Sequence, residues 1–326
     1  MNEQLIVKYI KTKKKVRKIV TYKEDGELRK YHEAVVKYLD KYTCNSIFAK
    51  AYVPHSSIYK NAQAHMFNDV FLKMDIKDFF PSINHKYLAE CLYFEINKRA
   101  SISRKECYDI VKKCSVGDKG LPLGLVPSPA LANLYMKEFD GLLYGKIKRM
   151  GLKNPIYTRY ADDMVISFQM LPDYMEKVEL LRREIWELLK KFHLTVNSNK
   201  TKVYNLEKSN HVRITGISIT KDENNYRHIS VGRKLKDEIL WSAINCYDQE
   251  TKDYTEIAHL KGVYSFVLSI EKEGIEKCYS KKMKELITER GFDSLTQMIK
   301  ALGEKQKASS IALDLDESIS DHNEEQ

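Results

Sequence analysis

Three aspartates have the type and spacing expected of a metal-dependent phosphoryl-transfer centre. Asp162 and Asp163 are adjacent within YTRYADDMVISF, between two short apolar runs that predict the strands of a hairpin. Asp75 ends the apolar run FLKMDI, where a carboxylate on a core strand is costly without a partner. Carboxylates held close together repel each other, and a divalent cation between them removes the conflict. The acids therefore predict two ions, roughly 3.5–4 Å apart, that activate an attacking hydroxyl and stabilise a leaving oxygen.

The cation expected at this centre is Mg²⁺, with Mn²⁺ as an alternative. Mg²⁺ requires octahedral oxygen ligands and usually takes one or two carboxylates together with the phosphates of a substrate. A simpler interpretation makes Asp162 and Asp163 an ordinary surface turn and Asp75 the N-cap of a helix. The apolar strands on both sides of these acids favour the metal centre.

The charge of the chain predicts a polyanionic partner. Its 326 residues include 55 Lys and Arg against 45 Asp and Glu, which gives a net charge of +10. Residues 8–30 hold ten bases and three acids, whereas the polar tail 303–326 is acidic and is expected to be disordered. A nucleic acid fits a basic body of this kind.

Cysteine usage and hydropathy indicate a cytoplasmic protein that makes no contact with a membrane. The six cysteines show no metal-binding spacing and are expected to be buried thiols in a reducing compartment. The first 20 residues are charged throughout, so no signal peptide is predicted. The sequence has no apolar run of the roughly 18 residues that a membrane span requires.

The elements that must position the acids follow an α+β order, with the strands in one sheet and the helices behind it. Two basic strands are expected within residues 13–31, joined by a turn at Asp25 and Gly26. Three glycines and three prolines make 117–129 a structured loop. Apolar periodicity predicts helices at 31–42, 85–113, 128–150, 173–193 and over most of 230–302, and strands at 71–75, 156–160, 164–168, 194–204 and 213–220.

Three segments in order resemble the palm of reverse transcriptases. They are MDIKDFFPSI (74–83), GLPLGLVPSPALANL (120–134) and YADD (160–163). Further segments resemble the retron reverse transcriptases of bacteria: NAQAH (61–65), RITGISIT (213–220) and the thumb-like AHLKGVYSFVLSIEKEG (258–274). The resemblance implies an RNA-directed DNA polymerase.

The resemblance also implies a right-hand architecture of fingers, palm and helical thumb, in which an antiparallel palm sheet is backed by helices. The fingers are expected at 1–70 with a helical insertion at 84–120, and the palm at 71–220. The thumb, expected to bind RNA, covers 221–302 and precedes the acidic tail 303–326.

Roles at the catalytic centre follow from the same resemblance. Asp75, Asp162 and Asp163 match the metal-binding triad, with the backbone carbonyl of Ile76 as a further ligand. Lys200 matches a lysine proposed to protonate the departing pyrophosphate. The nucleotide-binding candidates are the triphosphate contacts Arg17 and Lys15, the bulky Phe80 that excludes a 2′-hydroxyl, and Gly124 where backbone approaches a base pair.

One departure from the family pattern affects the nucleotide site. Leu123 stands where these enzymes usually carry glutamine, and it offers no side-chain hydrogen bond to template or nucleotide. Fidelity, rate or template preference is therefore expected to differ from the family pattern.

The implied partners are deoxynucleoside triphosphates, a cognate non-coding RNA that serves as primer and template, and a separate effector protein of the same operon. The product would be branched RNA–DNA, called msDNA, and the system would act in antiphage defence. The RNA-binding candidates are Asn61, His65, Lys234, Lys236, Lys281 and Lys282.

Three alternatives remain open at this stage. One is another defence-associated or abortive-infection reverse transcriptase that makes protein-primed or untemplated DNA. The second is a catalytically weak scaffold that binds RNA and an effector. The third is a two-metal nuclease, which accounts for the acids but not for Phe80 or Arg17.

Overall fold

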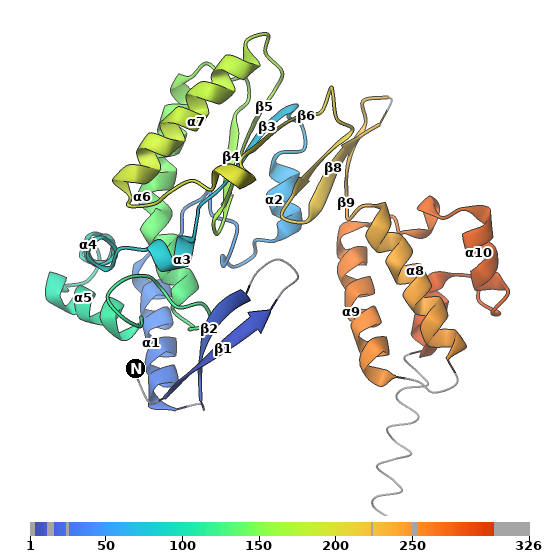
Figure 1. The fold of residues 1–326 in the computed structure, drawn as a ribbon, viewed down its shortest axis with the longest axis horizontal. Coiled ribbons are helices and arrows are strands. Elements are labelled where there is room, and N and C mark those ends of the chain that lie inside the picture. The colour runs from blue at the N-terminus through green and yellow to red at the C-terminus, as the bar shows by residue number, and fades with distance from the viewer. Residues whose placement is uncertain (1–3, 12–15, 24–25, 223, 250–252, 303–326) are drawn as a thin grey trace, which may run out of the picture. The chain divides into compact units, whose positions relative to one another are not determined.

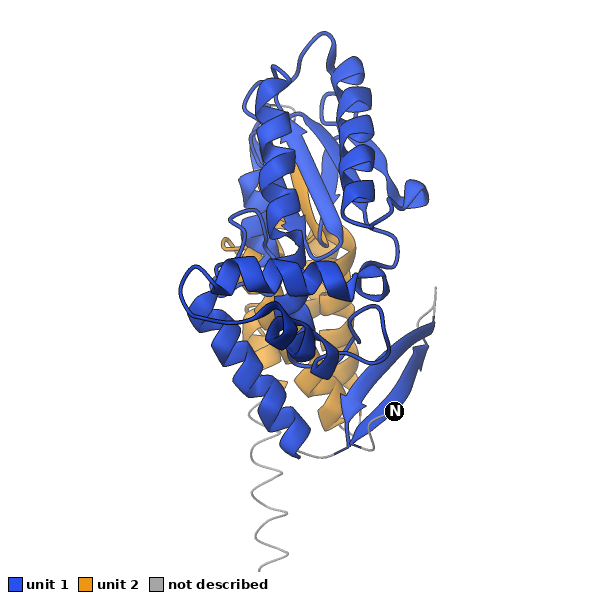
Figure 2. Cartoon of the chain, turned by 90° about the vertical axis from the view of Figure 1, so that its left-hand side faces the viewer, with its two compact units in different colours: residues 1–215, 221–227 blue, residues 216–220, 228–326 orange. Residues whose placement is uncertain are grey.

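The computed structural model describes residues 4–11, 16–23, 26–222, 224–249 and 253–302, which form two compact units (Figure 2). The first unit comprises 1–215 with 221–227, and the second comprises 216–220 with 228–326. Helices and antiparallel sheets are mixed along the chain, as the α+β prediction requires (Figure 1). The strands form three separate sheets, so the expectation of one sheet is wrong. The tail 303–326 and Lys15 lie outside the described residues.

The strands of the first unit build a two-stranded and a four-stranded sheet, of order β1-β2 and β4-β5-β3-β6. A third sheet, of order β7-β8-β9, lies where the chain passes between the units. The strands are β1 (Leu5–Lys11), β2 (Val16–Tyr22), β3 (Val70–Asp75), β4 (Ile156–Tyr160), β5 (Asp163–Phe168), β6 (Lys202–Asn205), β7 (His211–Ile214), β8 (Ile217–Lys221) and β9 (Arg227–Ser230).

The helices surround the four-stranded sheet in the first unit and make up most of the second (Figure 1). The first unit contains α1 (Glu27–Tyr42), α2 (Ile58–Ala64), α3 (Phe79–Ser82), α4 (His85–Ile96), α5 (Arg104–Lys113), α6 (Ser128–Arg149), α7 (Tyr174–Lys191) and the 3₁₀ turn η1 (Ser198–Lys200). The second contains α8 (Arg233–Asp248), α9 (Tyr254–Ile270), η2 (Glu276–Cys278) and α10 (Lys281–Thr288). Within the described residues, no helix has the length and apolar character needed to cross a membrane.

The register of the four-stranded sheet gives β3 and β5 one fully apolar face and one mixed face, on which the apolar Phe71 and Val165 alternate with polar and acidic side chains. In β3 and β5 the pairs Val70–Phe168, Leu72–Ile166 and Met74–Met164 point to one side, because directly paired residues share a face. These six side chains are buried in the main core together with residues of α6 and α7. The alternate residues of β3 and β5, which end at Asp75 and Asp163, therefore point away from these two helices.

The segment before β3 supports one end of this mixed face. His65 follows α2 and is fully buried. Its two ring nitrogens are hydrogen-bonded to the hydroxyls of Thr158 and Ser167, each at 2.7 Å. Burial lowers the pKa of His65 to about 3, so the ring is neutral. This face is therefore buried around His65, and the acids Asp75 and Asp163 lie at its other end.

Three predicted strands differ from the structure. The predicted strand 213–220 is divided into β7 and β8 by a turn at Thr215 and Gly216. Residues 27–31, predicted as part of a strand, open helix α1, because His32, Val35 and Leu39 recur at helical spacing and are buried. The partner of β2 is therefore the preceding strand β1. In the predicted strand 194–204, the regular strand is confined to Lys202–Asn205, after the turn η1, and Val196 forms an isolated bridge with Ile76.

The six cysteines are not uniformly buried, which corrects the sequence-based expectation. Cys44 is exposed, and Cys91 and Cys278 are partly buried. The buried thiols are Cys107, Cys114 and Cys246.

Candidate active site

The three aspartates predicted as metal ligands meet at one end of the four-stranded sheet. Asp75, the last residue of β3, lies directly opposite Asp163, the first residue of β5. Directly opposed residues of antiparallel strands have Cα atoms roughly 4.5–5.5 Å apart and side chains on the same face. Asp163 is also paired with Tyr160, so Ala161 and Asp162 form the two-residue turn. The backbone N–H of Ile76 donates to the Asp162 carbonyl at 3.0 Å and fixes this turn to the end of β3.

The electrostatics of the turn indicate negative charge that nearby cations compensate only in part. Partial desolvation, followed by repulsion from Asp162 and Asp75, raises the pKa of Asp163 to about 6. Desolvation, and then repulsion from Asp75, also raises the pKa of Asp162. Carboxylates in this state gain from a bound cation, which favours their ionised forms.

Asp75 is held by two residues of the segment before β6. The Nζ atom of Lys200 lies 2.6 Å from one carboxylate oxygen, and Asn197 Nδ2 donates to the other at 2.9 Å. The hydrogen bond to Asp75 raises the pKa of Lys200, so its ammonium is protonated. The backbone N–H of Asn197 also donates to the Asp75 carbonyl at 2.7 Å. Lys200 was predicted to lie at the site, whereas Asn197 was missed by the sequence analysis.

The carboxylate oxygens of the three aspartates fit a metal ion whose remaining ligands come from the substrate. Among the described residues, no group of three or more His, Cys, Asp or Glu side chains is arranged as a ready metal cage. Mg²⁺ needs only one or two carboxylates when phosphate oxygens supply further ligands. The raised pKa of Asp163 and the ammonium of Lys200 on Asp75 both indicate a place where positive charge is stabilised.

A buried ionic network fixes the turn from the helix side of the sheet. Arg159, fully buried in β4, makes a bidentate pair with Asp140 of α6 at 2.9 Å. Its Nη1 also donates to the side chain of Asn133 and to the carbonyl of Ala161, next to Asp162. The sequence did carry a signal, since an arginine within an apolar strand requires a buried partner.

The nucleotide-binding candidates Arg17 and Phe80 lie near the acids. Arg17 is exposed on β2, and its charge contributes to lowering the pKa of Asp162, against the larger effects of burial and Asp75. Phe80, in α3, is 8% exposed and packs its ring edge-to-face against Tyr52. Tyr52 was not singled out from the sequence.

Gly124 makes a close backbone approach within the protein itself. Its φ is +107°, and a Cβ atom there would lie 2.5 Å from the Val20 carbonyl oxygen of β2. The adjacent carbonyl of Leu123 accepts a hydrogen bond from the N–H of Val20 at 2.8 Å. The expected approach of Gly124 to a base pair stays a prediction, and the approach that the structure contains is to β2.

A partly buried chain of hydrogen bonds joins the same loop to α1. The N–H of Val126 donates to the Tyr22 hydroxyl, which in turn bonds to His32 Nδ1 at 2.6 Å. His32 Nε2 lies 2.9 Å from the Lys113 carbonyl, which can only accept. Nε2 therefore carries the proton and Nδ1 accepts from Tyr22, consistent with burial lowering the pKa of His32.

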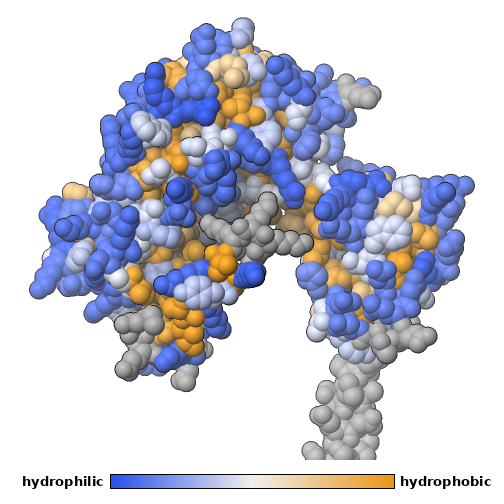
Figure 3. All heavy atoms as spheres, viewed as in Figure 1, coloured by the Kyte–Doolittle hydropathy of each residue, from blue (hydrophilic) through white to orange (hydrophobic). Residues whose placement is uncertain are grey.

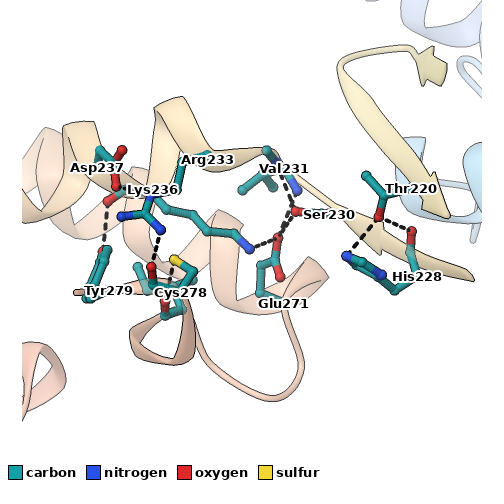
Figure 4. Close-up of polar contacts among 12 residues, drawn as sticks. Thr220, His228, Ser230, Val231, Arg233, Lys236, Asp237, Glu271, Cys278 and Tyr279 are labelled. Atoms are coloured by element: carbon teal, nitrogen blue, oxygen red, sulfur yellow. Dashed lines mark hydrogen bonds and ion pairs between the residues drawn. The ribbon is translucent and has the colours of Figure 1, made fainter. Parts of the chain in front are cut away.

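The RNA-binding candidates divide into exposed and buried side chains. Asn61 and His65 are fully buried, so the structure supports their bracing role and leaves them no surface for direct contact with RNA. Lys236 is a correction, because its ammonium is 2.9 Å from Glu271 and both side chains are nearly buried (Figure 4). Glu271 also accepts hydrogen bonds from Ser230 and Val231, which precede α8. The exposed candidates are Lys234, Lys281 and Lys282.

Sequence comparison places this site in a known family. The family model for reverse transcriptase (RNA-dependent DNA polymerase) matches residues 10–235. The retron Ec73 reverse transcriptase of Escherichia coli is 30% identical over 235 residues, covering 68% of this chain and 72% of that protein. The retron Ec86 reverse transcriptase of the same organism is 28% identical, covering 82% and 74% respectively. The chain therefore belongs to the reverse transcriptases and, among them, to the retron reverse transcriptases.

Solved structures give a weaker likeness. Apo telomerase from Candida tropicalis superposes with a TM-score of 0.47 at 12% sequence identity, over 91% of this chain and 63% of that one.

Family membership defines the chemistry and the class of cofactor. The chain is an RNA-directed DNA polymerase with the right-hand architecture of that fold, and enzymes of this family use divalent metal ions. The predicted fold and enzymatic activity are confirmed.

Proposed function

We propose that this polymerase copies a cognate non-coding RNA, encoded beside it, into DNA that stays covalently joined to that RNA. The RNA acts as both primer and template, and synthesis starts from the 2′-hydroxyl of an internal guanosine. The retron names of the relatives and the retron-like segments of the chain support this proposal. The observation that carries the chemistry is the pairing of Asp75 with Asp163 beside the turn at Asp162.

The side chains of the site have separate roles in this proposal. Asp75, Asp162 and Asp163, with the carbonyl of Ile76, hold two Mg²⁺ ions, which would supply the positive charge that activates the primer hydroxyl and stabilises the leaving oxygen. Lys200, protonated and 2.6 Å from Asp75, delivers a proton to the departing pyrophosphate.

The nucleotide is held from the other side of the site. Arg17, exposed on β2, pairs with the triphosphate, with Lys15 assisting. Phe80 stands against the sugar and excludes a 2′-hydroxyl, which selects deoxynucleotides. Gly124 keeps the loop that carries Leu123 close to β2.

The larger divisions follow the same proposal. Fingers (1–70 with 84–120) and palm (71–220) build the polymerase centre, and the thumb (221–302) grips the RNA through the exposed Lys234, Lys281 and Lys282. A separate effector protein completes an antiphage system.

The test is a labelling experiment on the purified chain with the RNA that co-purifies with it. Addition of Mg²⁺ and labelled deoxynucleotides should produce DNA that remains attached to RNA until a debranching enzyme cleaves the 2′–5′ bond. Asp162→Asn should abolish labelling while leaving RNA bound.

Other outcomes identify the alternatives. Labelled DNA free of RNA indicates a different defence-associated reverse transcriptase. RNA binding with little synthesis indicates the scaffold, which Leu123 favours because it lacks the hydrogen bonds of glutamine. Cleavage of added DNA would indicate a nuclease.

A further inference from the structure

Tyr52 combines exposure with a strained and firmly supported backbone. Its side chain is 54% exposed although it lies in a short segment next to the palm sheet. Its φ of +57° falls in the left-handed region, which is costly for a bulky residue and recurs at functional sites. The preceding carbonyl, of Ala51, accepts a hydrogen bond at 2.9 Å from Asn133, which also bonds Arg159. The network that fixes the acidic turn thus also fixes Tyr52.

The surroundings of Tyr52 are those of the nucleotide site. Its ring centroid lies 6.5 Å from that of Phe80, in an edge-to-face arrangement with an interplanar angle of 78°. Burial, and then the charge of Asp162, raises the pKa of its hydroxyl, and the nearby Arg17 acts in the opposite direction. The side chain therefore lies among an acid of the turn, the arginine of β2 and the phenylalanine of α3.

The polar end of Tyr52 is available to a ligand. Among the described residues none is hydrogen-bonded to its hydroxyl, although that group lies near both a carboxylate and a guanidinium. Other exposed tyrosines of the first unit, such as Tyr9 and Tyr226, show no ring contact with Phe80. A phenol in this position can bond the sugar or phosphate oxygens of a nucleotide, because it both donates and accepts.

We propose that Tyr52 is a specificity-determining residue of the polymerase, which contacts the incoming deoxynucleoside triphosphate through its hydroxyl and holds the ring of Phe80 against the sugar. The second half of this inference rests on the role proposed above for Phe80. The contact with the nucleotide does not depend on how the enzyme is primed.

The experiment uses the full chain on a plain RNA template with an annealed DNA primer, so that retron priming is not needed. Tyr52→Ala is compared with Tyr226→Ala, which removes another exposed ring of the first unit, 68% exposed against 54% for Tyr52. We expect Tyr52→Ala to raise KM for deoxynucleotides roughly tenfold, with a smaller change in kcat, and to lower the preference for deoxynucleotides over ribonucleotides roughly tenfold. Tyr52→Phe should keep the sugar preference and raise KM severalfold.

A double variant separates the two halves. If Tyr52 acts on sugar preference through Phe80, then Tyr52→Ala adds little to the loss caused by Phe80→Ala. A KM and a sugar preference equal to those of Tyr226→Ala overturn the inference. If Phe80→Ala leaves the sugar preference unchanged, the role proposed for Phe80 is wrong. The contact of Tyr52 with the nucleotide is then judged from KM alone, and an unchanged KM in Tyr52→Ala shows that this contact is also absent.

Discussion

At the scale of single residues, the side chain of Asn197 determines how Asp75 is oriented. It binds one carboxylate oxygen while Lys200 binds the other, so the carboxylate cannot rotate freely. Residues that orient metal ligands typically contribute about 10–100-fold in affinity or activity. We expect Asn197→Ala to lower primer extension by about that factor and to raise the Mg²⁺ concentration needed for half-maximal rate.

The matched control for Asn197 is Asn199→Ala, two residues further on, whose side chain is exposed in η1. It should leave the Mg²⁺ dependence unchanged. If both variants lose activity equally and neither changes the Mg²⁺ dependence, then activity depends on the conformation of η1 and not on the side-chain amide of Asn197.

The raised pKa of Asp163 predicts a pH-dependent stability in metal-free protein. Between the ordinary pKa of 3.8 and about 6, folded protein retains a proton that the unfolded chain has released. Stability therefore falls as pH rises through this window, and the loss persists above it. Because this side chain is exposed, we expect an effect of at most about 1 kcal/mol.

Thermal unfolding with chelator and with Mg²⁺, at pH 4.5 and pH 7.5, measures this effect. With chelator, Asp163→Asn should match wild type at pH 4.5 and be more stable at pH 7.5. Mg²⁺ should stabilise wild type at pH 7.5 more than the variant. An identical response of both proteins to Mg²⁺ would contradict a role for Asp163 in holding the ion.

At the scale of elements, the loop before α6 is fastened to β2 at Gly124. A Cβ atom there would meet the Val20 carbonyl and also Ile19 Cγ2 at 2.7 Å. Gly124→Ala should therefore cost roughly 3 kcal/mol, since it adds overpacking to the strain of positive φ. Gly117→Ala is the control, because its φ is +84° with open space around it, and it should cost roughly 1–2 kcal/mol.

Chemical denaturation of the two glycine variants provides the measurement, and KM for deoxynucleotides should rise only in Gly124→Ala because β2 carries Arg17. Equal costs would show that backbone strain alone accounts for both positions.

The elements most securely predicted from sequence were those with long apolar periodicity or a turn between two apolar runs. Helix α7 and the hairpin of β4 and β5 are examples, because their patterns are local. The first turn of α1, residues 27–30, was missed because the buried residues that mark the helix, His32, Val35 and Leu39, all come after it.

The candidate site, too, was predicted only where its residues belong to local sequence patterns. The three aspartates and Lys200 were found through their motifs, whereas Asn197 and Tyr52 were missed. Asn197 contacts Asp75 across 122 residues of sequence. Tyr52 acquires its neighbours only when β2, α3 and the acidic turn are assembled. No spacing rule within a single segment detects such residues.

At the scale of the whole molecule, the surface combines hydrophilic and apolar regions. Figure 3 shows both, with apolar side chains over the β1–β2 hairpin, where Ile10 and Val16 are exposed.

Positive charge has two different uses in the second unit. Charged side chains of the second unit include both exposed lysines and a lysine that supports the fold. Lys234 and Lys236 represent these two kinds, only two residues apart.

Lys236→Ala should destabilise the protein by roughly 3 kcal/mol, because it leaves Glu271 without its counter-charge. Lys234→Ala should change stability by no more than about 0.5 kcal/mol. It should instead reduce the slope of log affinity for RNA against log salt by roughly 0.7–0.9, as expected for one lost phosphate contact.

Denaturation and RNA binding over a salt series measure the two effects. If Lys234→Ala leaves the salt slope unchanged, this lysine is a solvated surface charge and the RNA contact proposed for it is wrong.

The ammonium of Lys200, 2.6 Å from Asp75, has a consequence for the order of events in the polymerase. A cation that bound this oxygen would compete with the lysine, which serves as an internal counter-ion. Metal binding would then free Lys200 for the proton transfer proposed for it. Binding of the metal and release of the proposed proton donor would thus be coupled.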